Sequence, residues 1–270
     1  MLLNYITWDV GPEIFSIGSL SVRWYGLLFA LSFVAGYIIV GNMFKREGIP
    51  QKALDRLTTY MVIGTVIGAR LGHCFFYEPE YYLSNPIRIL KIWEGGLASH
   101  GAAIGILIAL YFFARKSRKP YLWILDRIVV VIALAGLFIR TGNLMNSEIY
   151  GNATTLPWGF IFVNRGETAP KHPTQLYEGL SYFVIFIILY MLYLKRRDKM
   201  QHGILFGLFL FLLFAVRFLI EFVKEPQVEF EREMTLNMGQ WLSIPFILAG
   251  LVILYLKRKP PERNRAKKKP

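Results

Sequence analysis

Seven stretches of apolar residues alternate with short polar breaks along the chain. They lie at about residues 20–43, 53–77, 97–115, 121–140, 174–194, 203–223 and 236–256. Each is close to the roughly 20 residues that a helix needs to cross a bilayer. The breaks between them carry charge, proline and glycine. This pattern predicts an all-α integral membrane protein, a single domain of seven transmembrane helices over residues 1–270.

Composition supports a chain in contact with lipid. Of the 270 residues, 54% are hydrophobic and 18% are charged, whereas soluble domains average about 45–50% and about 25%. These values exclude an intrinsically disordered chain. The single cysteine, Cys74, cannot form an internal disulfide, and no Cys/His spacing suggests a metal site. We therefore expect no metal and no cofactor.

Lysine and arginine are distributed unevenly between alternate connections. The breaks after the first, third and fifth stretches, together with the C-terminal segment, hold 19 of them, whereas the other breaks hold 6. Because cytoplasmic loops are enriched in these residues, the N-terminus is predicted outside and the basic tail, residues 257–270, in the cytoplasm. The net charge of +13 therefore reflects membrane orientation and indicates no nucleic-acid partner.

Polar and ionisable residues inside the stretches gather toward one side of the membrane. Each ionisable residue costs about 2.5–3.5 kcal/mol at the centre of a helix, so its position is informative. In the predicted orientation, eight side chains from six helices fall in the outward half: Tyr25, Arg70, His73, His100, Arg140, Glu178, Arg217 and Glu221. Arg217 and Glu221 are one turn apart and are expected to pair. This convergence predicts a polar cavity that opens toward the outer leaflet.

The connection between the fourth and fifth stretches is the longest. Residues 141–173 are too many for a simple connector and are predicted to form an extracytoplasmic insertion, with a short strand over residues 155–163. Other features suit structural roles. Gly64, Gly68 and Gly72 recur every four residues, as in close helix packing. Asp126 and Arg127 are expected to stabilise helix ends or each other.

The polar run RTGNLMNSEIYG at residues 140–151 resembles the R-x-G-N-F-x-N-x-E-x-x-G signature of bacterial prolipoprotein diacylglyceryl transferases. It departs at Leu144, where Phe is usual, and follows Ile139, where Gly is usual. Further similar motifs lie at residues 23–26, 68–72, 95–101, 172–178 and 217–222, so the resemblance covers almost the whole chain. Many family members carry a tyrosine one turn before the last arginine, where this chain has Leu213.

The resemblance implies transfer of the diacylglyceryl group of phosphatidylglycerol to the lipobox cysteine of a prolipoprotein, with formation of a thioether and release of glycerol phosphate. It implies a bacterial inner-membrane enzyme whose active site faces the outer leaflet. The expected partners are phosphatidylglycerol, surrounding lipid and prolipoprotein signal peptides.

The candidate residues suit this chemistry. A thiol with a pKa of about 8.5 is mostly protonated at neutral pH, so His100 is the expected general base. Arg140 and Arg217 are expected to hold the phosphate leaving group, with Glu148 and Glu221 orienting them. The expected substrate-binding residues are Arg140, Tyr25, Asn143, Asn146, Glu148, Gly151 and Glu221. The alternative role for the two asparagines is turn formation.

A different class of function also fits the outward arginines: a seven-helix anion transporter, a receptor or a lipid-binding protein without chemistry. A transporter is expected to show related halves with broken helices at the midplane, and the sequence contains no such internal repeat. Lipidation of a lipobox peptide in detergent, where no compartments exist, discriminates between the two classes.

The charge asymmetry predicts how single cysteines label in intact spheroplasts. In a Cys74→Ala background, Asn152→Cys is expected to react with an impermeant thiol reagent, whereas Ser117→Cys is expected not to react. The reverse pattern would overturn the predicted orientation and the outward placement of every candidate residue.

Overall fold

The computed structural model describes residues 5–18, 20–226, 231 and 234–258. The predicted basic tail, residues 257–270, therefore lies outside the described residues apart from its first two. The chain divides into two compact units. Residues 1–36 and 126–270 form the first unit, and residues 37–125 form the second.

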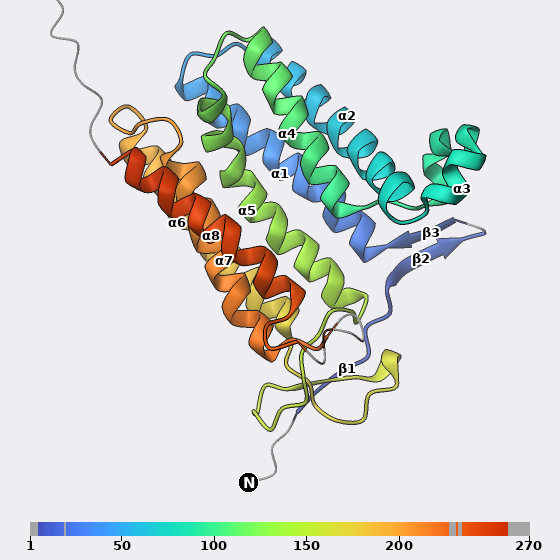
Figure 1. The fold of residues 1–270 in the computed structure, drawn as a ribbon. Coiled ribbons are helices and arrows are strands. Elements are labelled where there is room, and N and C mark those ends of the chain that lie inside the picture. The colour runs from blue at the N-terminus through green and yellow to red at the C-terminus, as the bar shows by residue number, and fades with distance from the viewer. Residues whose placement is uncertain (1–4, 19, 227–230, 232–233, 259–270) are drawn as a thin grey trace, which may run out of the picture. The chain divides into compact units, whose positions relative to one another are not determined.

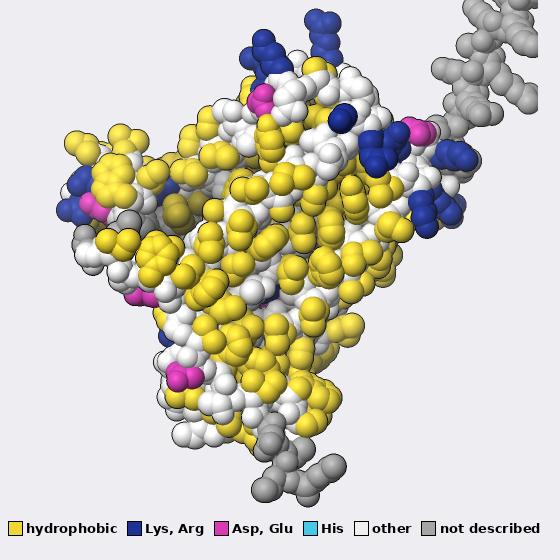
Figure 2. Space-filling view, turned by 180° about the vertical axis from the view of Figure 1, so that it is seen from behind, with side chains coloured by type: hydrophobic (Ala, Val, Ile, Leu, Met, Phe, Trp, Pro, Cys, Tyr) yellow, Lys and Arg dark blue, Asp and Glu magenta, His cyan; other side chains and the backbone are white. Residues whose placement is uncertain are grey.

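All seven apolar stretches form helices (Figure 1). They are α1 (Trp24–Arg46), α2 (Gln51–Phe76), α4 (Ser99–Lys116), α5 (Tyr121–Met145), α6 (Thr174–Arg196), α7 (Ile204–Ile220) and α8 (Met238–Leu256). Within the described residues, five of them are long and apolar enough to cross a membrane: α1, α5, α6, α7 with the turn that follows it, and α8. Hydrophobic side chains cover most of the face in Figure 2, as expected for a protein solvated by lipid. The chain is a helical membrane protein that crosses the bilayer several times.

In the first unit, neighbouring helices α5, α6, α7 and α8 alternate in direction. The C-terminal ends of α5 and α7 meet the N-terminal ends of α6 and α8, because Arg140 on α5 contacts Glu178 on α6 and Glu221 after α7 contacts Asn237 before α8. At the other end of these helices, the buried Asp126 on α5 accepts hydrogen bonds from the backbone N–H groups of Gly203 and Phe206, at 2.6 and 2.9 Å. Asp126 thus caps the start of α7, which confirms its predicted role at a helix end.

Two small sheets accompany the helices of the first unit. Strand β1 (Ile6–Trp8) pairs in parallel with β4 (Phe160–Phe162), and β2 (Glu13–Ile17) pairs antiparallel with β3 (Leu20–Arg23). The hydrophobic pattern predicts no element before residue 20 and a first helix from about residue 20, but α1 begins at Trp24 because residues 20–23 are a strand. The strand expected over residues 155–163 covers only 160–162, since the Gly159 N–H bonds the Leu156 carbonyl in a turn.

The sheet formed by β1 and β4 packs on the end of α5. Leu144, Phe160 and Phe162 form a buried apolar cluster, with Trp8 and Tyr150 against it. The Trp8 indole N–H also donates to the Leu144 carbonyl at 3.0 Å. The chain's first strand therefore fixes the segment that leaves α5.

In the second unit, α2 and α4 pack closely through glycine. Gly64, Gly68 and Gly72 on α2 face Gly101 and Gly105 on α4, and a Cβ added at Gly68 would collide with the Gly101 carbonyl and lie 2.8 Å from the Gly105 Cα. This contact confirms the packing role predicted from the four-residue glycine spacing. Beyond α2, the chain continues through α3 (Pro79–Ser84), η1 (Pro86–Leu90) and η2 (Ile92–Glu94).

Candidate active site

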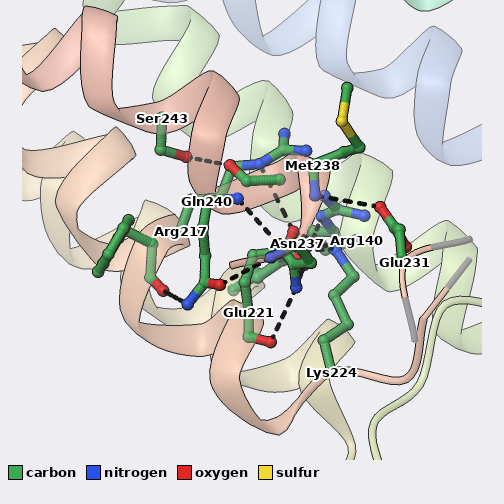
Figure 3. Close-up of polar contacts among 12 residues, drawn as sticks. Arg140, Arg217, Glu221, Lys224, Glu231, Asn237, Met238, Gln240 and Ser243 are labelled. Atoms are coloured by element: carbon green, nitrogen blue, oxygen red, sulfur yellow. Dashed lines mark hydrogen bonds and ion pairs between the residues drawn. The ribbon is translucent and has the colours of Figure 1, made fainter. Parts of the chain in front are cut away.

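Five charged side chains gather where the ends of α5, α6, α7 and α8 meet. They are three cations and two carboxylates: Arg140, Arg217, Lys224, Glu178 and Glu221. In Figure 3 the side chains of Arg140, Glu221 and Lys224 lie together. The convergence that the sequence predicts is confirmed for the members that belong to the first unit. Within the described part of the chain, no group of three or more His, Cys, Asp or Glu side chains is placed to hold a metal ion.

Arg140 is held on several sides. Its Nε lies 2.5 Å from a carboxylate oxygen of Glu178, a residue with no exposed surface. Its Nη1 donates to the Asn143 side-chain oxygen at 3.2 Å. Tyr182, one turn after Glu178 on α6, also hydrogen-bonds Arg140, and its ring packs where a Cβ at Gly136 would stand. The guanidinium of Arg140 therefore has a fixed orientation.

Arg217 is held more loosely. Its Nε lies 3.7 Å from Glu221 Oε1, which confirms the predicted pairing but exceeds hydrogen-bond distance. Its side chain is 32% exposed, compared with 13% for Arg140. Glu221 is fixed from elsewhere, because Asn237 Nδ2, just before α8, donates to its Oε2 at 3.2 Å. Gly239 allows this approach, since a Cβ there would collide with the Glu221 carboxylate.

Lys224 joins the two carboxylates. Its side chain is 4% exposed, and its Nζ lies 3.4 Å from Glu178 Oε1 and 3.1 Å from Glu221 Oε1. Glu178 is also the ion-pair partner of Arg140, and Glu221 is that of Arg217. The buried ammonium of Lys224 therefore connects these two ion pairs. From the sequence, Lys224 counts only as one of the charges in the connections between helices. Its spacing of three residues from Glu221 was the available signal.

The polar run after Arg140 forms a second network. Glu148 Oε1 accepts hydrogen bonds from the side-chain amides of Asn143 and Asn146, at 2.8 and 3.1 Å. Glu148 thus contacts the two asparagines, and Asn143 in turn contacts Arg140. That Glu148 orients Arg140 stays a prediction. The carboxylate that pairs with Arg140 is Glu178 instead, because α6 packs against α5 there.

Tyr25 lies in the first turn of α1 beside this network. A Cβ added at Gly142 would lie 2.8 Å from the Tyr25 ring, so the ring packs directly on the backbone of α5. The charges of Glu148 and Arg140 both act on the Tyr25 hydroxyl. Tyr25 thus belongs to the same site, as the sequence analysis expected.

Gly151 permits a close approach between two backbone segments. Its N–H donates to the His172 carbonyl at 2.8 Å, and it forms an isolated bridge with Lys224. A Cβ at Gly151 would collide with the Val223 carbonyl. Glycine at this position therefore allows the turn to pack beside Lys224.

Arg70, in the second unit, forms hydrogen bonds with backbone carbonyl groups. Its side chain is buried and lies over the Tyr82 ring. Its guanidinium donates to four carbonyls in the segment after α2, those of Arg88, Ile89, Gly95 and Gly96. These contacts assign Arg70 a structural role within its own unit.

The two candidate histidines also belong to the second unit. His73 lies 3.5 Å from Glu78 and stacks on Tyr77. His100 is the second residue of α4 and is exposed.

The insertion carries further polar contacts. Trp158 Nε1 donates to the Tyr177 hydroxyl at 2.9 Å, and His172 Nδ1 lies 3.2 Å from the same oxygen. Burial lowers the pKa of His172, because it disfavours the charged imidazolium. Burial, together with a hydrogen bond to Glu167, raises the pKa of Tyr150 to about 12. Both shifts favour the neutral form of the group.

The chain is similar over nearly its whole length to proteins that share one description. The family described as Prolipoprotein diacylglyceryl transferase matches residues 12–256. The phosphatidylglycerol–prolipoprotein diacylglyceryl transferase of Tolumonas auensis is 51% identical over 257 residues, covering 95% of this chain and 99% of the relative. The corresponding proteins of Chloroherpeton thalassium and Bacteroides fragilis are 47% and 42% identical, covering 93% and 96% of this chain and 94% and 97% of the relatives.

Removing the Lys224 charge is expected to destabilise the fold strongly. Lys224→Met keeps the side-chain length but leaves two buried carboxylates without their shared cation, so the free energy of unfolding should fall by about 3–5 kcal/mol. Lys91→Met is the matched control, because Lys91 and its partner Glu94 are both more than one third exposed. This control substitution should lower the free energy of unfolding by less than about 1 kcal/mol. Denaturant unfolding in detergent checks both values, and equal losses would contradict the role of Lys224.

Proposed function

The chain belongs to the prolipoprotein diacylglyceryl transferase family, and from this premise we propose how its charged cluster performs the reaction. As a member of this family, the chain is an enzyme that transfers the diacylglyceryl group of phosphatidylglycerol to the cysteine of a prolipoprotein. The resemblance stated from the motifs is thereby confirmed.

We propose seven membrane spans in a single domain, with the N-terminus outside and residues 257–270 in the cytoplasm. In this arrangement residues 141–173 are an extracytoplasmic insertion, and the active site faces the outer leaflet of the bacterial inner membrane. The uneven distribution of Lys and Arg supports this orientation. The alternating helix directions of the first unit also support it, because Lys195 and Arg196 end α6 opposite the charged cluster.

The excess positive charge of the cluster carries the proposal for phosphate binding. Three cations share two carboxylates, so a phosphodiester brings the missing negative charge. Among the described residues, no hydrogen-bond partner is present for Arg217 Nε, and its partly exposed guanidinium is placed to donate hydrogen bonds to phosphate oxygens. Arg140 presents a second, fixed guanidinium. Planar guanidinium groups bind two phosphate oxygens at once.

The same arginines suit the bond-breaking step. The substrate thiol loses its proton to a base. Its sulfur then forms a bond to the carbon of the diacylglyceryl group that carries the phosphate. The carbon–oxygen bond breaks, and glycerol phosphate leaves with the electron pair. Negative charge therefore grows on the phosphate oxygens in the transition state, where preoriented donors have their largest effect. We assign this stabilisation to Arg140 and Arg217.

The headgroup hydroxyls are assigned to the network around Glu148. Asn146 Oδ1 is buried and has no hydrogen-bond partner among the described residues. It is therefore an acceptor suited to a glycerol hydroxyl. Tyr25 and Asn143 belong to the same network around Glu148, and Gly151 and Glu221 stay predicted substrate-binding residues. The expected general base remains His100, as the sequence analysis proposed.

A reaction in detergent tests this function directly. Purified protein, phosphatidylglycerol and a cysteine-containing lipobox peptide should yield lipidated peptide and glycerol phosphate, detected by mass spectrometry. Phosphatidylethanolamine should be a poor donor, because its headgroup lacks the glycerol hydroxyls. Absence of product with every phospholipid would remove the enzyme function.

The role of His100 is tested by His100→Gln, which retains hydrogen bonding but accepts no proton near neutral pH. Turnover should fall by about 10²–10⁴-fold if His100 is the general base, and higher pH should restore part of it by supplying substrate thiolate. His202→Gln, before α7, is the control and should retain activity. Wild-type turnover of His100→Gln at neutral pH would exclude this role.

The role of Arg140 is tested by Arg140→Lys, which keeps the charge but loses the planar fork. Turnover should fall by roughly 10²-fold or more, while affinity for phosphatidylglycerol changes only a few-fold, because the lost interaction strengthens in the transition state. Arg196→Lys, at the opposite end of α6, is the control. A loss confined to affinity would make Arg140 a headgroup anchor instead.

A further inference from the structure

The turn that carries Glu148 is strained. Ser147 and Ile149, on either side of Glu148, both adopt left-handed backbone conformations, with φ of 50° and 61°. This region suits glycine, and it is most unfavourable for a β-branched residue such as Ile149. Such conformations persist only where surrounding contacts hold them.

Side chains from two other segments hold this turn by its carbonyls. Arg165 Nη2 and Nε donate to the carbonyls of Asn146 and Ser147, at 3.0 and 2.9 Å. Gln175 Nε2 donates to the Glu148 carbonyl at 2.7 Å, and Gln175 is only 1% exposed. Together these two residues form hydrogen bonds with three consecutive carbonyls.

A third residue, Thr174, forms a hydrogen bond with the next carbonyl. The Thr174 hydroxyl, which has no exposed surface, bonds the Ile149 carbonyl at 2.9 Å. The four carbonyls of residues 146–149 therefore all accept hydrogen bonds from side chains outside the turn. This arrangement fixes where the side chain of Glu148 emerges.

The position of Glu148 in turn orients Arg140. Because Glu148 accepts from Asn143 Nδ2, the amide of Asn143 cannot rotate, and its oxygen faces Arg140 Nη1. The contacts thus run from Arg165 and Gln175 through the turn to Glu148, then to Asn143 and to Arg140.

We propose that Arg165 and Gln175 are positioning residues of the transfer reaction, which act through Glu148 to hold Arg140 in its productive orientation. The inference rests on the proposed function of Arg140. Without these donors the turn relaxes toward unstrained backbone angles, and the Glu148 carboxylate leaves the amide of Asn143. Arg140 then loses one of its restraints, and an oriented donor must reorganise during the reaction.

Arg165 provides the primary test, because it lies on the surface, where substitution is compatible with folding. Arg165→Gln should lower kcat by about tenfold or more with little change in the melting temperature. Arg165→Lys keeps the charge but not the paired donors, so its kcat should remain nearly as low as that of Arg165→Gln. Asn164→Ala is the matched control, since Asn164 makes a similar exposed bond to the Val10 carbonyl but none to the turn.

Gln175→Met provides a second, isosteric variant that removes only the buried donor. Both variants are combined with Glu148→Ala, and turnover and affinity for short-chain phosphatidylglycerol are measured. If Arg165 and Gln175 act through Glu148, each substitution should lower turnover by less than about twofold in the Glu148→Ala background. An equal loss in both backgrounds would overturn the proposal. Wild-type activity of Glu148→Ala alone would instead overturn the role proposed for Glu148.

Discussion

Two carboxylates buried at the ends of membrane helices set the arrangement of the whole site. Glu178 has no exposed side-chain surface and Glu221 only 8%, and a buried charge is tolerated only when it is paired and hydrogen-bonded. Each acid holds one arginine, and Lys224 contacts both. Arg217, Glu221 and Lys224 follow one another along α7 and the turn after it. Glu178 on α6, in contrast, is paired only by Arg140 from α5 and by Lys224, so the ends of α5, α6 and α7 must meet for its charge to be compensated.

The same requirement explains why the cluster suits a phosphate group. The two acids leave one positive charge in excess, and they hold the arginines unequally, with Arg140 fixed and Arg217 partly exposed. A fixed donor is preorganised for charge that develops during a reaction, while a looser one is free to follow an entering lipid. In a diacylglyceryl transferase, whose lipid substrate contains a phosphodiester, both properties are useful.

Features governed by local sequence were predictable, and features governed by distant contacts were not. The apolar stretches became helices because length and hydropathy determine them, and the Arg217–Glu221 pair follows from helical spacing. Strand β1 was missed because its partner, β4, lies about 150 residues away in the chain. The preference of Arg140 for Glu178 depends on how α5 packs against α6, and the burial of Lys224 depends on both acids. Neither is visible in residue spacing.

The most direct measurement is the distance between lipid phosphorus and arginine nitrogen in a bilayer. Solid-state ³¹P–¹⁵N dipolar dephasing, on ¹⁵N-arginine-labelled protein with bound phosphatidylglycerol, reports contacts within a few ångströms. Close phosphate–guanidinium contacts in the wild-type protein should weaken in Arg140→Lys and again in Arg217→Lys, and should disappear when both are replaced. Dephasing unchanged by both substitutions would contradict phosphate binding by this cluster.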